Sequence, residues 1–362
     1  VFNQIRGFGE YGFPESHATS FALLVYVSAW LKCHHPAAFT AALLGSQPMG
    51  FYAPAQLVRD ARAHGVAVLP ADVNASHWHA TLEPRAKAEG GEPKTESRPA
   101  LRLGLEQVHG LGAAEAERVV AARQAGAFRL PRDLAHRARL DRDALLHLAR
   151  AGALASLGLS RRRAVWEAMR CLEGPQHRPL LEGLADDDLD DDLGLPSMTR
   201  QEEVIADYRT GGLSLTAHPL AFEREQLAAA GVLPIATATA GPEGHRVCVT
   251  GIVLMRQRPA TAKGMIFLTI EDETGAANIV VRPAVWAAAN HMTRRAAVLQ
   301  VWGRVQRRGA VVHLVAAQLA AALTHRPTSA GSSDEAPAAA TPSGRSGGMP
   351  LAALPRMSRD FC

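Results

Sequence analysis

The segment 108–119, VHGLGAAEAERV, constrains the fold of this chain more than any other stretch of its sequence. Gly110 and Gly112 bracket Leu111, and apolar residues follow at helical spacing. Glycines permit a tight turn with positive φ and leave backbone N–H groups bare. At the N-terminus of the following helix these groups favour an anion, so a DNA phosphate fits there without any base being read. The segment predicts a helix-hairpin-helix, which clamps the DNA backbone independently of its sequence.

Basic residues surround this motif and cluster again further along the chain. Residues 101–165 carry twelve Lys/Arg against six Asp/Glu, and residues 245–325 carry ten against three. Two basic blocks suggest a polyanionic partner, and Arg118 and Arg123, on the helix after the hairpin, are candidates for the DNA contact. Two plainer interpretations stay open. One is a Gly-x-Gly turn without a ligand, and the other is an arginine-rich surface set by genome composition, since only four of the 39 basic residues are Lys.

Apolar periodicity predicts a helical start for the chain. Three helices are expected in the first 70 residues, at 18–31, 37–44 and 54–64. Ser16 is the expected N-cap of the first helix. A short strand at 66–69 follows, and Leu82 with residues 101–105 should form a β-hairpin with a long exposed tip.

Helical patterns continue after the hairpin motif. A helix over 141–151 that runs into Gly152 resembles a degenerate second copy of the motif, and residues 160–172 should form a basic amphipathic helix. A polar stretch, 173–198, is typical of a linker and contains the acidic run DDDLDDD at 186–192. Two further helices are expected, one starting at 199 and one over 219–230.

From Arg246 onward the periodicity changes to two. Five β-rich segments are expected, at 247–255, 265–271, 277–281, 298–305 and 310–315. A helix at 284–292 lies between the third and fourth segments, and this is the order of an OB-fold. Residues 323–362 are mostly Pro, Ser, Gly and Ala, and are predicted to be a disordered tail.

The loop between the first two strands of this predicted barrel is a candidate nucleic-acid surface. Arg256, Arg258 and Lys263 would neutralise backbone phosphates there, and Phe267 could offer a face on which a base stacks. The alternative is a solvated basic loop, with Phe267 in the core of the barrel.

No pattern in the sequence amounts to an active site, and no metal ligands or catalytic residues are assigned. The carboxylates of 271–273 could in principle hold metal ions, but their place between two strands favours a turn. His34, His35, His77 and His79 lack Cys or Glu partners at fixed spacing, which favours ordinary packing or surface histidines. The four scattered cysteines indicate neither a zinc site nor a disulfide framework. The reducing cytoplasm is therefore the expected location. No apolar run reaches 18 residues, so no membrane span is expected.

Longer strings resemble one protein family. Four segments carry the likeness: FGEYGFPESHATSFALLVYVSAWLKCHHPAAF at 8–39, LGSQPMGF at 44–51, DYRTGGLSLTAHP at 207–219 and MRQRPATAKGMIFLTIEDE at 255–273. The chain resembles the bacterial C-family (DnaE-type) DNA polymerase III alpha subunits, in their error-prone branch, over roughly residues 1–322.

The resemblance implies a multidomain α+β architecture in the order of that family. Its expected domains are the C-terminal part of the fingers (1–70), a β-hairpin with tandem helix-hairpin-helix (71–172), an acidic linker with connecting helices (173–243), an all-β OB barrel (244–322) and the tail (323–362). The chain begins with Val1 inside an apparent structural unit, so it is expected to be a C-terminal fragment.

The resemblance also implies a DNA-directed DNA polymerase used in damage-induced, mutagenic (translesion) synthesis. The family's palm aspartates hold two Mg²⁺ ions and lie upstream of the fingers, so this chain should bind no Mg²⁺ and be inactive alone. Primer-template DNA, dNTP in the full-length enzyme and accessory mutasome proteins are the implied partners. Arg6, Ser16 and His17 are implied to lie near the incoming nucleotide or the template.

One feature limits this interpretation, and two other functions compete with it. Replicative relatives carry a clamp-binding peptide after the hairpin domain, where this chain has the acidic run at 186–192, which argues against direct sliding-clamp binding. A non-catalytic DNA-binding or scaffold protein built from the same modules is the alternative function. An RNA-binding OB protein of the tRNA-synthetase type is a third, against which the fingers-like string argues.

Overall fold

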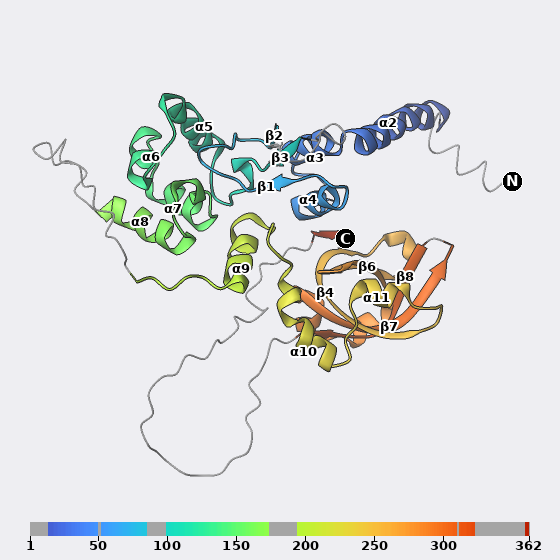
Figure 1. The fold of residues 1–362 in the computed structure, drawn as a ribbon. Coiled ribbons are helices and arrows are strands. Elements are labelled where there is room, and N and C mark those ends of the chain that lie inside the picture. Colours follow the sequence, from blue (N-terminus) through green and yellow to red (C-terminus); the bar gives the residue numbers. More distant parts are fainter. Residues whose placement is uncertain are drawn as a thin grey trace, which may run out of the picture. The chain divides into compact units, whose positions relative to one another are not determined.

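The computed structural model describes residues 14–49, 52–84, 99–173, 194–309, 311–322 and 359–361. The chain divides into two compact units (Figure 1). Unit 1 comprises residues 1–159 and 164–177, and unit 2 comprises residues 160–163 and 178–362.

The described part of unit 1 starts with the three expected helices, α2 (Pro14–His34), α3 (Pro36–Gly45) and α4 (Pro54–Ala63). Proline occupies the first helical position of α3 and of α4, where its missing N–H costs nothing and its fixed φ favours the helix. Because α2 already begins at Pro14, Ser16 lies within its first turn. The expectation that Ser16 caps this helix is therefore wrong.

A small sheet follows, formed by β1 (Val68–Leu69), β2 (Thr81–Glu83) and β3 (Ala100–Arg102) in the order β1-β3-β2. β2 and β3 pair antiparallel, as the expected hairpin requires, and β1 pairs with β3 in parallel. The Arg102 guanidinium donates to the Glu83 carboxylate across the hairpin at 2.8 Å. Most of the expected hairpin tip, residues 85–98, lies outside the described residues.

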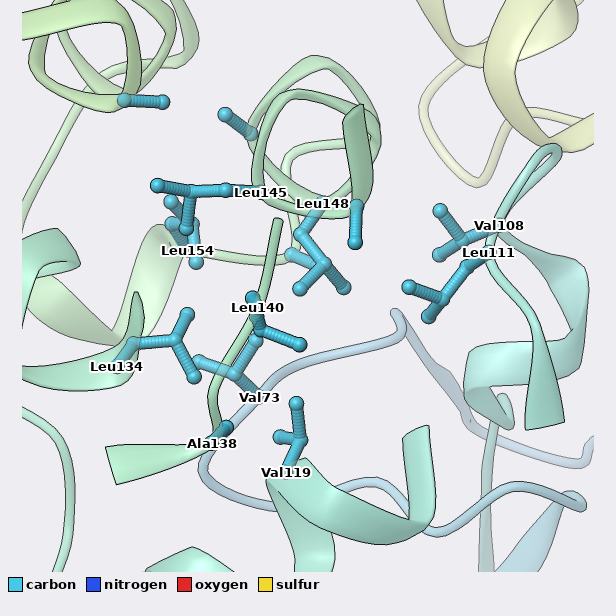
Figure 2. Close-up of a cluster of buried hydrophobic side chains, with 14 of the residues drawn as sticks. Val73, Val108, Leu111, Val119, Leu134, Ala138, Leu140, Leu145, Leu148 and Leu154 are labelled. Atoms are coloured by element: carbon cyan, nitrogen blue, oxygen red, sulfur yellow. The ribbon is translucent and has the colours of Figure 1, made fainter. Parts of the chain in front are cut away.

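The remainder of unit 1 is helical. Its elements are η1 (Leu105–Gln107), α5 (Ala113–Ala122), η2 (Arg123–Ala125), α6 (Pro131–Arg137), α7 (Arg142–Arg150), η3 (Ala155–Leu157) and most of α8 (Arg161–Glu173). Their apolar faces share one core, in which Leu134, Leu145 and Leu148 are fully buried. Figure 2 shows Leu111 and Leu140, each from a turn before a helix, directed into this same cluster.

Unit 2 opens with four short helices, α9 (Arg200–Gly211), η4 (Pro219–Glu223), α10 (Arg224–Ala229) and α11 (Ile235–Ala240). A capping box starts α9: Thr199 accepts from the Glu202 N–H, and the Glu202 carboxylate accepts from the Thr199 N–H. The single helix expected over 219–230 is divided into η4 and α10, and α11 had no counterpart in the sequence analysis.

The expected five-stranded barrel forms from β4 (Arg246–Gln257), β5 (Ile266–Asp272), β6 (Gly275–Val281), β7 (Val298–Arg308) and β8 (Val311–Ala321). Neighbouring strands run in the order β5-β6-β8-β7-β4, and β4 pairs again with β5, which closes the barrel. β6 and β8 are parallel and the other barrel pairs are antiparallel. This is the OB topology.

The helix expected between the third and fourth strands is present as two short helices, α12 (Pro283–Ala288) and α13 (His291–Arg295). The division falls at Asn290, whose side chain accepts from the Thr293 N–H at 2.7 Å and so starts a new helix.

One part of the expected disordered tail is ordered. Residues Arg359–Phe361 form β9, which pairs in parallel with the last residues of β4. The expectation of disorder is wrong for these three residues, because β4 outruns its pairing with β7 and leaves an edge open to another strand. Residues 323–358 lie outside the described residues.

Asp272, at the end of β5, joins the short helices of unit 2 to the barrel. Its side chain is fully buried and accepts hydrogen bonds from the Ile235 N–H, the Thr274 N–H and Oγ1, the Gly275 N–H and the Arg224 guanidinium. Arg224 also pairs with Glu273, at 2.9 Å between Nη2 and Oε2. This network fixes the start of α11 and the turn between β5 and β6.

We predict that Asp272→Asn lowers the free energy of unfolding by about 3–5 kcal/mol, because an amide cannot balance the partly buried Arg224 or accept the same set of bonds. Chemical denaturation measures the loss. Glu225→Gln is the matched control, since Glu225 is exposed beside Arg224 and should change stability by less than about 0.5 kcal/mol. A loss for Asp272→Asn no larger than for the control would contradict this role.

Candidate nucleic-acid interface

The first hairpin, residues 108–112, connects η1 to α5. Gly110 has a φ of +86°, and a Cβ at this position would overlap the imidazole ring of His147 on α7. Glycine meets both conditions without strain and without a shift of the His147 ring. Leu111 is buried in the core of unit 1 and anchors the turn from below, so the exposed backbone of the hairpin is held in one conformation.

Gly112 has a different role from Gly110. Its φ of −88° is ordinary, so only Gly110 of the two glycines supplies the positive φ of this turn. It is the N-cap of α5, and its carbonyl accepts the first helical bond, from the Ala116 N–H. No side chain of residue 112 caps the helix, so the exposed N–H groups of the first turn keep the partial positive charge that attracts an anion.

The carboxylate of Glu115 lies against this turn. A Cβ on Gly112 would overlap it, and Arg118 Nη2 donates to its other oxygen at 3.3 Å. The negative charge of Glu115 opposes an anion at the amides, and its pairing with Arg118 offsets part of that effect.

The two candidate arginines of the helix are bound to protein carbonyls. Arg118 Nε donates to the Ala138 carbonyl at 3.1 Å. Arg123 Nη1 donates to the carbonyls of Val73 and Ser76 at 3.2 and 2.6 Å, and burial lowers the pKa of its guanidinium, an effect that the Asp72 carboxylate opposes. The structure thus uses both side chains to hold neighbouring turns, and contact of either side chain with DNA stays a prediction.

A second hairpin, residues 138–141, repeats the backbone of the first. Arg139 has a φ of +49°, Leu140 is buried, and Asp141 is the N-cap of α7. The second copy is therefore present, but its turn precedes α7, and Gly152 only ends that helix. Unlike Gly112, Asp141 caps its helix, because its carboxylate accepts from the Ala144 N–H at 2.8 Å.

A third turn of this kind was missed by the sequence analysis. Gly158 has a φ of +76°, Leu159 follows, and Ser160 precedes α8 and accepts from the Arg163 N–H at 3.3 Å. Its signal, Gly-Leu-Ser before a helix, is present in the sequence and matches Gly-Leu-Gly at the first hairpin.

Of the three basic residues predicted for the barrel loop, one is buried and two are exposed. Arg256 lies within β4, is only 7% exposed and donates to the Ala296 carbonyl. The prediction that it is a loop residue is wrong, because β4 continues through Gln257, two residues further than expected. Arg258 and Lys263 are exposed in the loop, and Lys263 has a φ of +50°.

Phe267 lies on the outer face of β5. It is 36% exposed, whereas its neighbours Ile266 and Leu268 are buried in the barrel core. The alternative that Phe267 fills the core is therefore wrong, and its ring is available for stacking from outside.

The fingers-like candidates are only partly described. Arg6 lies outside the described residues, as does the side chain of Ser16. His17 is exposed on α2, and its ring centroid lies 4.4 Å from that of Phe21.

Among the described residues there is no group of three or more His, Cys, Asp or Glu side chains arranged to hold a metal ion. Asp272 and Glu273 are committed to Arg224 and to backbone amides, which agrees with the interpretation of 271–273 as part of a structural turn. No helix within the described ranges is long and apolar enough to cross a membrane.

Comparisons with known proteins agree with this architecture. Residues 65–164 match the family model described as a helix-hairpin-helix motif, and residues 247–320 match that of an OB-fold nucleic acid binding domain. An error-prone DNA polymerase of Brucella abortus is 51% identical over 321 residues, which cover 88% of this chain and 29% of that protein. An error-prone DNA polymerase of Methylococcus capsulatus is 49% identical over 331 residues, covering 88% of this chain and 31% of that protein.

The chain belongs to the error-prone DNA polymerase family. The resemblance to DnaE-type polymerases predicted this relationship, and the two matched models cover the hairpin region and the barrel. The chain spans about 30% of the length of the error-prone DNA polymerases it matches, 29% for the Brucella abortus protein.

We predict that the buried and the exposed basic residues near the barrel loop respond differently to substitution. Replacing both Arg258 and Lys263 by Ala should flatten the plot of log K for single-stranded DNA against log salt by about 1.4, since each phosphate contact contributes about 0.7. Arg256→Met should lower thermal stability and leave this slope unchanged, because its guanidinium binds Ala296. A fluorescence-anisotropy titration at several salt concentrations measures both. Equal slopes for the wild type and the Arg258/Lys263 variant would exclude the loop as the binding surface.

Proposed function

We propose that this chain is the DNA-handling part of an error-prone DNA polymerase that performs damage-induced translesion synthesis. The observation that carries the proposal is the first hairpin, where Gly110 and Leu111 fix an exposed turn and Gly112 leaves the first amides of α5 uncapped. A phosphate of duplex primer-template DNA would accept hydrogen bonds from these amides. Because the donors are backbone groups, this contact reads no base.

The two hairpins are unequal as phosphate sites. The Asp141 carboxylate accepts from the Ala144 N–H in the first turn of α7, whereas no side chain of residue 112 caps the corresponding turn of α5. A carboxylate and a phosphate compete for the same donors and repel each other. The first hairpin is therefore the phosphate clamp in this proposal, and the second supports it from the shared core through Leu140 and His147.

The barrel would hold the single-stranded template. Arg258 and Lys263 supply exposed positive charge in the loop between β4 and β5, and Phe267 supplies an exposed ring on the adjoining strand. A basic groove with an aromatic face is the usual arrangement by which OB-folds bind single strands without sequence preference.

Catalysis would reside elsewhere in the longer enzyme. The described residues offer no carboxylate cluster that fits Mg²⁺, so no catalytic step is assigned to them. Apolar side chains cover much of α2, with Leu24, Val25 and Tyr26 all more than half exposed. A helix that is apolar on several faces is normally buried. The exposed apolar residues of α2 therefore support the proposal that other parts of a larger protein or assembly cover this helix. The same proposal includes contact of the nucleotide with Arg6, Ser16 and His17. It also includes accessory mutasome proteins as partners and the cytoplasm as the site of action.

We predict that the isolated 362-residue chain does not extend a primer. The described residues hold no fitting carboxylates, so Mg²⁺ and all four dNTPs should give no product with a primer-template in a gel assay. Primer-extension activity that co-elutes with the chain in gel filtration would contradict this assignment.

A second prediction concerns the charge at the first hairpin. Glu115→Gln should tighten duplex binding about two- to fivefold, equally for unrelated sequences, because it removes the carboxylate beside the proposed phosphate site. Glu117→Gln removes the same charge from an exposed position on the same helix and is the matched control. Anisotropy with two duplexes of different sequence measures the change.

The comparison between these two variants tests whether the effect of Glu115 is specific to the first hairpin. If Glu115→Gln and Glu117→Gln change affinity equally, the effect is general electrostatics and the clamp is not at this hairpin. An effect that depends on the duplex sequence would contradict a backbone contact.

A further inference from the structure

Two arginines stand side by side on the outer face of the barrel. Arg246 on β4 is in register with Arg304 on β7, and both side chains are exposed. Their neighbours along the strands, Val247 and Val305, are buried in the barrel core, so the two arginines lie on the opposite face of the sheet. Residues paired in this way have Cβ atoms about 5 Å apart, and two like charges there destabilise the sheet.

The protein does not neutralise this pair of charges with its own groups. Within the part of the chain that the structure describes, neither guanidinium group forms a hydrogen bond or an ion pair. Glu243 lies three residues before Arg246, but its carboxylate accepts from the Arg307 N–H. Unlike the arginines that hold backbone carbonyls, Arg246 and Arg304 therefore have no structural task that explains why they are adjacent.

An aromatic ring lies on the same face. Trp302 is two residues before Arg304 on β7, so its side chain projects from the same side of the sheet, and it is partly exposed. Its partner on β4 is Cys248, whose thiol accepts from the Gln300 amide at 3.3 Å. Burial raises the pKa of this thiol, so Cys248 adds no negative charge beside the ring at neutral pH.

The neighbouring strand β8 also brings no charge to this face. Gln318 is in register with Trp302, and Val315 with Arg304. The register shifts between these two pairs and leaves one extra residue in β8, Ala317, which is exposed like Gln318. A bulge of this kind bends its strand and increases the local twist. Neither β4 nor β8 places a carboxylate in register with the two residues of β7.

We propose that the outer face formed by Arg246, Trp302 and Arg304 is a second binding site for single-stranded DNA on the barrel. A phosphate between the two guanidinium groups would relieve their repulsion, and the planar guanidinium binds phosphate through paired hydrogen bonds. An unpaired base can stack on the indole, whereas the bases of a duplex are already stacked on one another. The combination of a phosphate site and a ring therefore favours a single strand.

This site is separate from the loop at 258–263. Arg246 begins β4, where the strand pairs with β7, and the loop follows the other end of β4, which pairs with β5. The inference rests on the proposed role of the barrel in holding single-stranded DNA, but it does not require the loop to bind. Substitutions at the two places can therefore be combined and their effects separated.

The test uses the 362-residue chain with Arg258 and Lys263 replaced by Ala, so that the loop no longer contributes. A fluorescent oligothymidylate should still bind this loop variant in an anisotropy titration. Adding Arg246→Gln and Arg304→Gln should weaken binding and flatten the plot of log K against log salt by about 1.4, since each phosphate contact contributes about 0.7.

The control adds Arg282→Gln and Arg295→Gln to the same loop variant. Both arginines are exposed, before α12 and at the end of α13, so the same charge is removed from another part of the barrel and the slope should not change. Equal losses with either pair of substitutions, or no binding by the loop variant itself, would overturn the second site. If the unmodified chain binds no oligothymidylate, the proposed role of the barrel fails and this site fails with it.

The ring has a test of its own in the loop variant. Trp302→Leu should weaken binding about fivefold or more, because it removes a stacked base, whereas Trp302→Phe keeps an aromatic face and should retain most of the affinity. An oligonucleotide that carries iodouracil should photo-cross-link to the peptide containing Trp302. Equal affinity of the Leu and Phe variants would overturn the stacking contact, and cross-links confined to other peptides would overturn the site.

Discussion

The contact between Gly110 and the imidazole of His147 is the constraint on which the hairpin region depends. It sets a turn of positive φ from the first hairpin directly against a helix of the second, and a Cβ at residue 110 would fit only if the imidazole moved away. Leu111 and Leu140 then reach the same core from the two turns (Figure 2). The exposed amides of α5 are therefore held rigid by packing beneath them, and a rigid donor set loses little entropy when an anion binds.

Much of the positive charge in this chain has a structural role. Many arginines in the basic blocks donate to backbone carbonyls. Arg137, for example, donates to the carbonyls of Ala122 and Gly126 at 2.6 Å each, and its guanidinium lies 4.5 Å from the centroid of the Phe128 ring. Arg118, Arg123 and Arg256 act in similar ways. The planar guanidinium with its five donors suits this task, and a count of basic residues cannot distinguish it from phosphate binding.

Apolar periodicity and glycine spacing predicted most of the fold. The barrel followed from alternating apolar residues, and the first hairpin from Gly-x-Gly before a helix. The errors arose where tertiary contacts decide. Arg256 is buried because β4 is longer than expected, and Arg359–Phe361 pair with an open edge that lies far away in the sequence. Local patterns do not contain these pairings, and Arg139 shows that even a positive φ can occur without glycine.

The central claim is that the first hairpin, and not the second, receives a DNA phosphate on its backbone amides. Titration of a ¹⁵N-labelled chain with a short duplex, followed by amide chemical shifts, tests it most directly. The account predicts large shifts at Ala113 and Ala114, the first residues of α5. It predicts small shifts at Arg142, Asp143 and Ala144, the first residues of α7, because the Asp141 carboxylate already accepts from the Ala144 N–H. Large shifts at Arg142 and Asp143 with none at Ala113 and Ala114 would contradict it.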